Sequence, residues 1–166
     1  FHLDIKPENI LITESFHPVL IDFGGHANEV SDETSKILRS GEYTPIEQLE
    51  GEGNTGPWSD LYALGVTLSR VITGTKLPEA TARLRNDQWE PLVDRDELTS
   101  RYSSRFLASI DAACVVCESD RLQTAEEWLA RLNEEDPTFS EWIEPLDIKN
   151  ESKSDPVGGS PLREEP

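Results

Sequence analysis

The polar residues near the start of the sequence have the types that a phosphoryl transfer requires. The chain opens with FHLDIKPENIL, and the triplet DFG follows at positions 22–24. Transfer of a phosphoryl group to a hydroxyl needs a carboxylate at the hydroxyl, a cation at the phosphate and oxygen ligands for magnesium. Asp4 is the candidate carboxylate and Lys6 the candidate cation. Asn9 and Asp22 are the candidate ligands of Mg²⁺.

A predicted β-hairpin explains how residues separated in sequence could act together. Residues 10–13 (ILIT) and 19–22 (VLID) are rich in β-branched residues and leucine, and the polar connection between them ends in Pro18. The paired strands would fix the distance between the loop that enters the hairpin and the loop that leaves it. We therefore expect the side chains of Asn9 and Asp22 to share one metal ion.

Helices are predicted for much of the remaining chain. The strongest pattern runs from Trp58 to Ile72, where apolar residues recur every three or four positions, and it ends at Gly74. Residues 24–57 show no sustained period and predict a long loop, with or without short helices. Weaker helical patterns occupy residues 79–87, residues 104–117 and the segment that a capping-box sequence opens at Thr124.

Composition and charge exclude several classes of protein. The chain has 166 residues, 36% of them hydrophobic, which suffices for a modest globular core. Its formal net charge of -18 would repel nucleic acids and anionic lipid surfaces. The sequence contains neither an apolar run of membrane-spanning length nor a leader pattern. We expect no nucleic-acid partner, no membrane segment in this chain and a cytoplasmic location.

The two cysteines, Cys114 and Cys117, are too few for a disulfide framework or a four-ligand zinc site. Both fall on the apolar face of the helix predicted at 104–117. We interpret them as small core residues rather than a redox pair, because free cysteine commonly packs as a small hydrophobic side chain.

The same motifs resemble those of the eukaryotic-type (Hanks-type) serine/threonine protein kinases, and their residue sequences are similar to those of bacterial members. The run from His2 to Asn9 is similar to the catalytic loop of that family, and residues 22–24 to its metal-binding triplet. Further along the chain, three more motifs resemble the end of the activation segment, the start of the central helix and a late arginine. They are Pro45-Ile46-Glu47, Asp60-Leu61-Tyr62-Ala63-Leu64-Gly65 and Arg121.

The resemblance implies a mainly α fold, that of a kinase C-terminal lobe with a short β-hairpin carrying the catalytic and metal-binding loops. It also implies ATP and Mg²⁺ as cofactors and a protein substrate as partner. Lys6 and Ser40 stand where members specific for Ser and Thr hydroxyls carry a lysine and a hydroxyl residue. The remaining residues that match are expected to support the site: His2, Phe23, Gly24, Glu47, Asp60 and Arg121. Among these, Glu47 and Arg121 would form a buried pair and Asp60 would hold amides of the catalytic loop.

The sequence also departs from the family pattern. Leu3 replaces an arginine that many members pair with a phosphorylated activation loop, which argues against control by that ion pair. The chain carries neither the Gly-rich loop nor the strand lysine and helix glutamate of the N-terminal lobe. We therefore expect a fragment of a longer kinase whose N-terminal lobe belongs to the parent protein. Alone it should be inactive, because positioning supplies most of the catalysis in this class.

These observations divide the chain into three parts and leave two alternatives to a protein kinase open. We expect a partial kinase domain at 1–135, an extension at 136–149 that packs on it, and a disordered acidic tail at 150–166. One alternative is a pseudokinase or scaffold that binds a partner protein without catalysis, against which the intact metal ligands argue. The other is a kinase of small molecules, such as an antibiotic or choline, in which the sequence of the catalytic loop typically differs.

Overall fold

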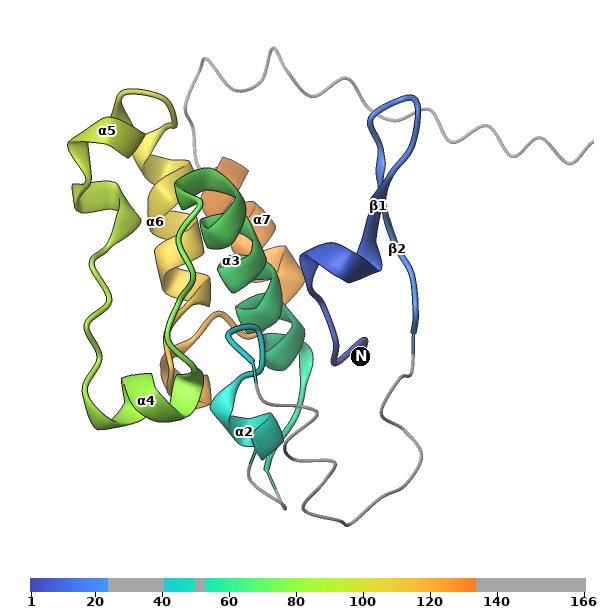
Figure 1. Ribbon diagram of the computed structural model, residues 1–166, viewed down its shortest axis with the longest axis vertical. Helices are drawn as coiled ribbons and strands as arrows, with labels where there is room; N and C mark the ends of the chain where they lie inside the picture. Colours follow the sequence, from blue (N-terminus) through green and yellow to red (C-terminus); the bar gives the residue numbers. More distant parts are fainter. Residues whose placement is uncertain (24–40, 50–52, 134–166) are drawn as a thin grey trace, which may run out of the picture. The chain divides into compact units, whose positions relative to one another are not determined.

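The structure, a computed structural model, describes residues 1–23, 41–49 and 53–133 (Figure 1). All of them belong to one compact unit, Phe1–Glu134, and a second unit comprises Glu135–Pro166. The extension and tail predicted at 136–149 and 150–166 lie outside the described residues. The described part is mainly helical, with one two-stranded sheet, which confirms the predicted fold class. None of the helices in these ranges is long and apolar enough to cross a membrane.

The hairpin forms where the sequence predicts it. Strand β1 (Ile10–Ile12) pairs antiparallel with β2 (Pro18–Leu20), with Leu11 opposite Val19. The 3₁₀ helix η1 (Pro7–Asn9) leads directly into β1. Both strands are shorter than predicted. The Thr13 amide donates to the His17 carbonyl within the connecting turn, and the Ile21 amide donates outside the strand ladder. The Ile21 N–H donates to the Asn9 carbonyl oxygen at 3.0 Å, which holds the two open ends of the hairpin together.

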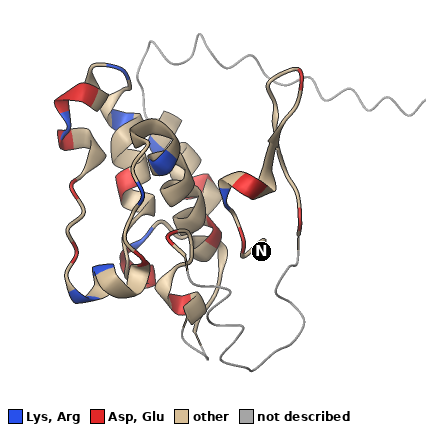
Figure 2. Ribbon diagram, in the orientation of Figure 1, with Lys and Arg blue, Asp and Glu red and all other residues tan. Residues whose placement is uncertain are grey.

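Most of the other elements form a helical body. Helix α3 packs against α6, and α6 packs against α7 (Figure 1). Helix α6 also packs against the short 3₁₀ helix η2. The elements of this body are α2 (Ile46–Leu49), α3 (Pro57–Thr73), α4 (Ala80–Arg85), η2 (Leu92–Asp94), α5 (Asp96–Thr99), α6 (Ser104–Ala113), η3 (Glu118–Asp120) and α7 (Ala125–Asn133). Lys, Arg, Asp and Glu residues are spread over helices, loops and the N-terminal segment (Figure 2).

Helix α3 is the centre of the core and matches its predicted bounds closely. Pro57 occupies its first turn, where the missing amide costs nothing, and Gly74 ends it in the left-handed conformation with φ of 69°. Its buried face includes Tyr62 and Val66, both fully buried. A Cβ atom at Gly65 would lie 2.8 Å from the Ala113 side chain, so this glycine permits close packing of α3 on α6.

The helix predicted at 104–117 is wrong at its end. Helix α6 stops at Ala113, which leaves Cys114 buried just beyond it and Cys117 exposed. The physical reason is Arg121, which lies five and six residues beyond the two carbonyl groups that it binds. Arg121 donates from Nε to the Val115 carbonyl at 2.8 Å and from Nη2 to the Val116 carbonyl at 2.7 Å. These bonds satisfy carbonyl groups that a continued helix would have used.

The predicted cap of the last helix is present in a modified form. The Thr124 hydroxyl accepts from the Glu127 amide at 3.1 Å, as an N-cap should. The Glu127 carboxylate accepts from the Gln123 amide at 2.9 Å instead of that of Thr124. The capping sequence therefore predicts the start of α7, although the return bond reaches one residue further back than in a standard capping box.

Candidate active site

Three of the residues predicted to carry the chemistry lie in direct contact. One carboxylate oxygen of Asp4, Oδ2, accepts from Lys6 Nζ at 2.8 Å and from Asn9 Nδ2 at 2.9 Å. Asn9 Nδ2 also donates to the Asp4 carbonyl at 2.8 Å. The side chains of Lys6 and Asp4 are 34% and 23% exposed. A partly exposed carboxylate therefore lies beside an ammonium group and a buried amide.

Asn9 has the chemistry of a ligand for a hard cation. Its side chain is buried, with 6% relative exposure, and its amide nitrogen is engaged with Asp4. That assignment leaves Oδ1 as the acceptor of the side chain, and an amide oxygen is a type of ligand that magnesium takes. The 3₁₀ helix η1 fixes the backbone here, since the Asn9 amide donates to the Lys6 carbonyl at 2.9 Å.

Asp22 comes directly after the backbone bond between Ile21 and Asn9. It is exposed and adopts the left-handed conformation, with φ of 65°. Aspartate tolerates that region better than most side chains, and such backbone conformations cluster at functional sites. The structure thus brings the backbone of the second predicted ligand close to that of the first. That the two side chains share one ion stays a prediction.

In residues 1–23, 41–49 and 53–133, no three His, Cys, Asp or Glu side chains gather as a metal-binding cluster. Only one of the two predicted ligands is of these types, because Asp22 offers a carboxylate whereas Asn9 offers an amide oxygen. Both are hard oxygen ligands. Because Nδ2 of Asn9 is bonded to Asp4, its Oδ1 is the atom that would bind a metal ion. The residues present therefore fit magnesium rather than a thiolate- or imidazole-bound metal.

His2 bridges the two loops of the site. It is buried, with Nδ1 accepting from the Asp4 amide at 3.3 Å and Nε2 lying 2.9 Å from the Ile21 carbonyl oxygen. This network requires the neutral tautomer with the proton on Nε2. The exposed ring of Phe23 lies 4.6 Å from the imidazole. His2 therefore connects the segment that carries Asp4 to the segment that carries Asp22.

Asp60, in the first turn of α3, holds the start of the Asp4 loop. Its Oδ2 accepts from the His2 amide at 2.8 Å and its Oδ1 from the Leu3 amide at 2.7 Å. Leu3 adopts the left-handed conformation, with φ of 63°, which a leucine rarely does. The helix therefore stabilises a backbone conformation that the residue itself disfavours.

Glu47 and Arg121 form a buried pair at 2.8 Å, with side-chain exposures of 2% and 0%. Ser59 Oγ donates to the same Glu47 oxygen at 2.8 Å. Arg121 also donates to the Trp58 carbonyl at 3.0 Å, and its guanidinium lies 4.7 Å from the Tyr62 ring centre. Every charge in this network is compensated, which indicates architecture rather than chemistry. Ser40 and Gly24 lie outside the described residues.

Another contact of the Asp4 loop has no local signal in the sequence. Gln48, next to Glu47 in α2, donates from Nε2 to the Leu3 carbonyl at 2.9 Å. A glutamine in a stretch predicted as loop has no pattern that points to a partner 45 positions away. Its place directly after the Pro45-Ile46-Glu47 motif is the one feature that could have marked it.

A second network that the sequence did not predict surrounds Arg83 in α4. This buried guanidinium donates to both oxygens of Asp87 at 3.0 Å, to the Cys114 carbonyl at 2.8 Å and to the Tyr62 hydroxyl at 3.3 Å. Arg83 and Asp87 are four positions apart, and that spacing was the available signal, although α4 ends at Arg85. Burial raises the pKa of Cys114 to about 12, so its thiol stays protonated and is no nucleophile.

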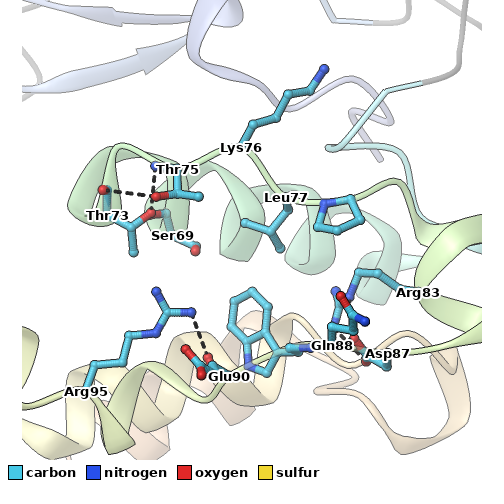
Figure 3. Close-up of a pocket in the computed structure, with 12 residues that line it drawn as sticks. Ser69, Thr73, Thr75, Lys76, Leu77, Arg83, Asp87, Gln88, Glu90 and Arg95 are labelled. Atoms are coloured by element: carbon cyan, nitrogen blue, oxygen red, sulfur yellow. Dashed lines mark hydrogen bonds and ion pairs between the residues drawn. The ribbon is translucent and has the colours of Figure 1, made fainter.

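A pocket of about 150 Å³ lies between the end of α3 and the segment that follows α4 (Figure 3). The Trp89 ring and the Leu77 side chain line it, together with Arg95, which donates to the Glu90 carbonyl at 3.0 Å. Arg83 also lines it but is engaged by Asp87. None of the residues predicted for catalysis or metal binding lines this pocket. It is therefore separate from the Asp4 site.

Comparisons with known proteins agree with these motifs. Residues 1–131 match the family described as the protein kinase domain. The serine/threonine-protein kinase PknK of Mycobacterium bovis is 45% identical over 75 residues, which cover 44% of this chain and 7% of that protein. Serine/threonine-protein kinase D of Synechocystis sp. is 33% identical over 134 residues, 75% of this chain and 25% of that protein.

A solved structure described as "PpkA-294 apo form" superposes with a TM-score of 0.66 at 37% sequence identity. The superposition covers 79% of this chain and 46% of that one. The matched parts thus span 7% and 25% of the two curated relatives, and less than half of the solved chain.

Proposed function

The chain belongs to the protein kinase family, with the helical architecture of the C-terminal lobe of a bacterial-type serine/threonine kinase, and from this we propose its activity. The protein that carries this chain transfers the γ-phosphate of ATP to Ser and Thr hydroxyls of proteins. Mg²⁺ and ATP are the proposed cofactors. The proposal is supported chiefly by the contact of Asp4 with both Lys6 and Asn9.

Each residue of this contact has a distinct proposed role. Asp4 orients the acceptor hydroxyl and takes its proton as the hydroxyl attacks. Lys6, at 2.8 Å from Asp4, places a positive charge beside the carboxylate, where negative charge on a transferring group would need compensation. Asn9 and Asp22 would hold the magnesium ion. When bound, ATP would supply the phosphoryl group, and magnesium would neutralise much of the charge on the phosphates.

The surrounding residues keep these groups in place. His2 ties the Asp4 amide to the Ile21 carbonyl, and Asp60 holds the backbone of His2 and Leu3 from helix α3. Catalysis of phosphoryl transfer depends largely on such positioning. The Gly-rich loop, the strand lysine and the helix glutamate that would position ATP are not in this sequence. We therefore propose that the 166-residue chain alone transfers no phosphate at a measurable rate, while the full-length protein does.

The first experiment measures phosphate transfer by the full-length protein to a generic protein substrate. Asp4→Asn should lower kcat by about 10²- to 10⁴-fold, the usual contribution of a positioned general base. The matched control is Asp96→Asn, because Asp96 is exposed on α5. Phosphoamino-acid analysis should find phosphoserine and phosphothreonine. Equal rates for the wild-type protein and the Asp4→Asn variant would remove Asp4 from this role.

One observation favours the alternative of a partner-binding protein without catalysis. The hairpin exposes apolar side chains, with Leu11 52% and Ile12 61% exposed, as a docking surface would. Magnesium-dependent binding of ATP by the full-length protein separates the two proposals. A scaffold would bind its partner equally well after Asp22→Asn, whereas a kinase would lose magnesium-dependent ATP binding.

We also propose the cytoplasm as the location of the described unit. Its two cysteines are free, which suits a reducing compartment. Fusion of a fluorescent protein to the full-length chain and fractionation of cells would test this location.

A further inference from the structure

The backbone just before Asp4 is held in an unusual conformation. Leu3 precedes Asp4 and lies in the left-handed region, with φ of 63°. A side chain with a Cβ atom disfavours this region, so the conformation persists only where surrounding groups hold it. The groups that hold Leu3 therefore contribute to the orientation of the Asp4 carboxylate, together with its bonds to Lys6 and Asn9.

Two helices hold Leu3 from opposite ends of the residue. The Leu3 amide donates to Asp60 Oδ1 of α3 at 2.7 Å, and the Leu3 carbonyl accepts from Gln48 Nε2 of α2 at 2.9 Å. That carbonyl belongs to the peptide group that joins Leu3 to Asp4. The other edge of this peptide group, the Asp4 amide, donates to His2 Nδ1 at 3.3 Å. Gln48 and His2 therefore fix the two edges of one peptide plane.

The two helices that hold Leu3 are themselves joined. Glu47 precedes Gln48 in α2, and Ser59 precedes Asp60 in α3; Ser59 Oγ donates to Glu47 Oε1 at 2.8 Å. Arg121 pairs with the same glutamate, so the position of α2 relative to α3 is fixed by buried bonds. Gln48 itself is only partly buried. It can therefore be replaced without leaving an unpaired charge in the core.

We propose that Gln48 is a positioning residue for the phosphoryl transfer, acting through the Leu3 carbonyl on the orientation of Asp4. The inference rests on the proposed role of Asp4. Helix α2 would then support Asp4, the residue that receives the proton, through the Leu3 carbonyl. In this role Gln48 acts on the Leu3 backbone rather than on substrate or cofactor, so its removal should lower the rate of the chemical step and leave nucleotide binding intact.

The test uses the full-length protein and two substitutions that remove the donor. Gln48→Met keeps the length of the side chain, and Gln48→Glu keeps its shape, so loss of folding in one leaves the other to decide. Both should lower kcat about tenfold, the equivalent of one hydrogen bond, with KM for ATP unchanged. Gln48→Lys retains an N–H donor on a long side chain and should recover most of the rate.

The matched control is Gln88→Met, because Gln88 is exposed and lies away from the Asp4 loop in the segment that lines the pocket. In an Asp4→Asn background, Gln48→Met should cause no further loss, because the group that it positions is gone. Wild-type kcat in Gln48→Met and Gln48→Glu, or an equal loss in Gln48→Lys, would overturn the inference while leaving the proposed function intact. No effect of Asp4→Asn would overturn both.

Discussion

Two carboxylate–cation pairs in this molecule have the same length and opposite surroundings. Asp4 and Lys6 lie 2.8 Å apart, with side chains 23% and 34% exposed. Glu47 and Arg121 also lie 2.8 Å apart, with side chains 2% and 0% exposed. An exposed pair contributes little to stability, whereas breaking a buried one is costly. The distance alone therefore does not distinguish a reactive group from a structural one; the surroundings do.

The backbone around the two pairs differs in the same way. Near Asp4, the left-handed conformation of Leu3 and Asp22 stores strain, and the hairpin exposes apolar side chains. Around Arg121, three backbone carbonyls accept from the guanidinium, and no left-handed residue occurs within the described helices α3 and α6. Strain and exposure belong to the end of the unit proposed to act on substrates.

The largest expected effect on stability comes from breaking the buried pair of Glu47 and Arg121. Arg121→Leu should lower the free energy of unfolding by about 3–5 kcal/mol, because the Glu47 carboxylate is left buried without a partner. Chemical denaturation of the full-length protein, followed by tryptophan fluorescence, measures the change. Arg131→Leu is the control, since Arg131 pairs with Glu127 at an exposed site. A loss as small as that of the control would contradict the structural role of the pair.

A smaller effect is expected at the second buried cation. Arg83→Met should destabilise the protein by about 1–3 kcal/mol, since the Cys114 carbonyl and the Tyr62 hydroxyl lose their donor. Asp87 is exposed and regains water. Thermal unfolding monitored by circular dichroism, compared with Arg85→Met at an exposed position of α4, measures it. An equal shift in the two variants would show that the buried bonds contribute nothing.

The partly exposed pair of Asp4 and Lys6 should behave in the reverse manner. Lys6→Met should change the free energy of unfolding by less than about 1 kcal/mol. Its kcat should nonetheless fall by roughly 10²-fold or more, as expected for loss of a charge that acts on the transition state. Stability and phosphate transfer are measured on the same preparation. A variant that unfolds easily but transfers phosphate normally would invert the comparison.

The smallest effect concerns the cysteines. Cys117 should react with iodoacetamide in the native protein, while Cys114 should react only after unfolding. Because burial raises the pKa of Cys114 from 9.0 to about 12, the neutral thiol favours the folded state. Its contribution is present below pH 9.0 and is lost as the pH rises toward 12. Mass spectrometry of the alkylated native protein measures both sites, and modification of Cys114 under native conditions would contradict the assignment.

Local patterns in the sequence predicted the hairpin and the central helix, and the prediction succeeded because the signals are themselves local. Runs of β-branched residues and a Pro-ended connection specify β1 and β2, and a three- and four-residue repeat that ends at Gly74 specifies α3. The contacts among Asp4, Lys6 and Asn9 were accessible too, since they lie within one short loop.

What the sequence could not predict depends on bonds between side chains and backbone groups that follow no repeating pattern. Helix α6 ends early because Arg121 takes the carbonyls of Val115 and Val116. Gln48 reaches Leu3 across 45 positions, and no local period marks such a bond. The same holds for Asp111, which accepts from the Trp89 indole at 3.1 Å and anchors the start of η2. These features follow only from the packed structure.

The central claim is that Asn9 and Asp22 hold one magnesium ion next to Asp4. A crystal structure of the full-length protein with magnesium and a non-hydrolysable ATP analogue tests it most directly. We predict an oxygen of each side chain at about 2.0–2.1 Å from a single ion. An ion bound to the nucleotide with neither side chain in its coordination sphere would contradict the claim.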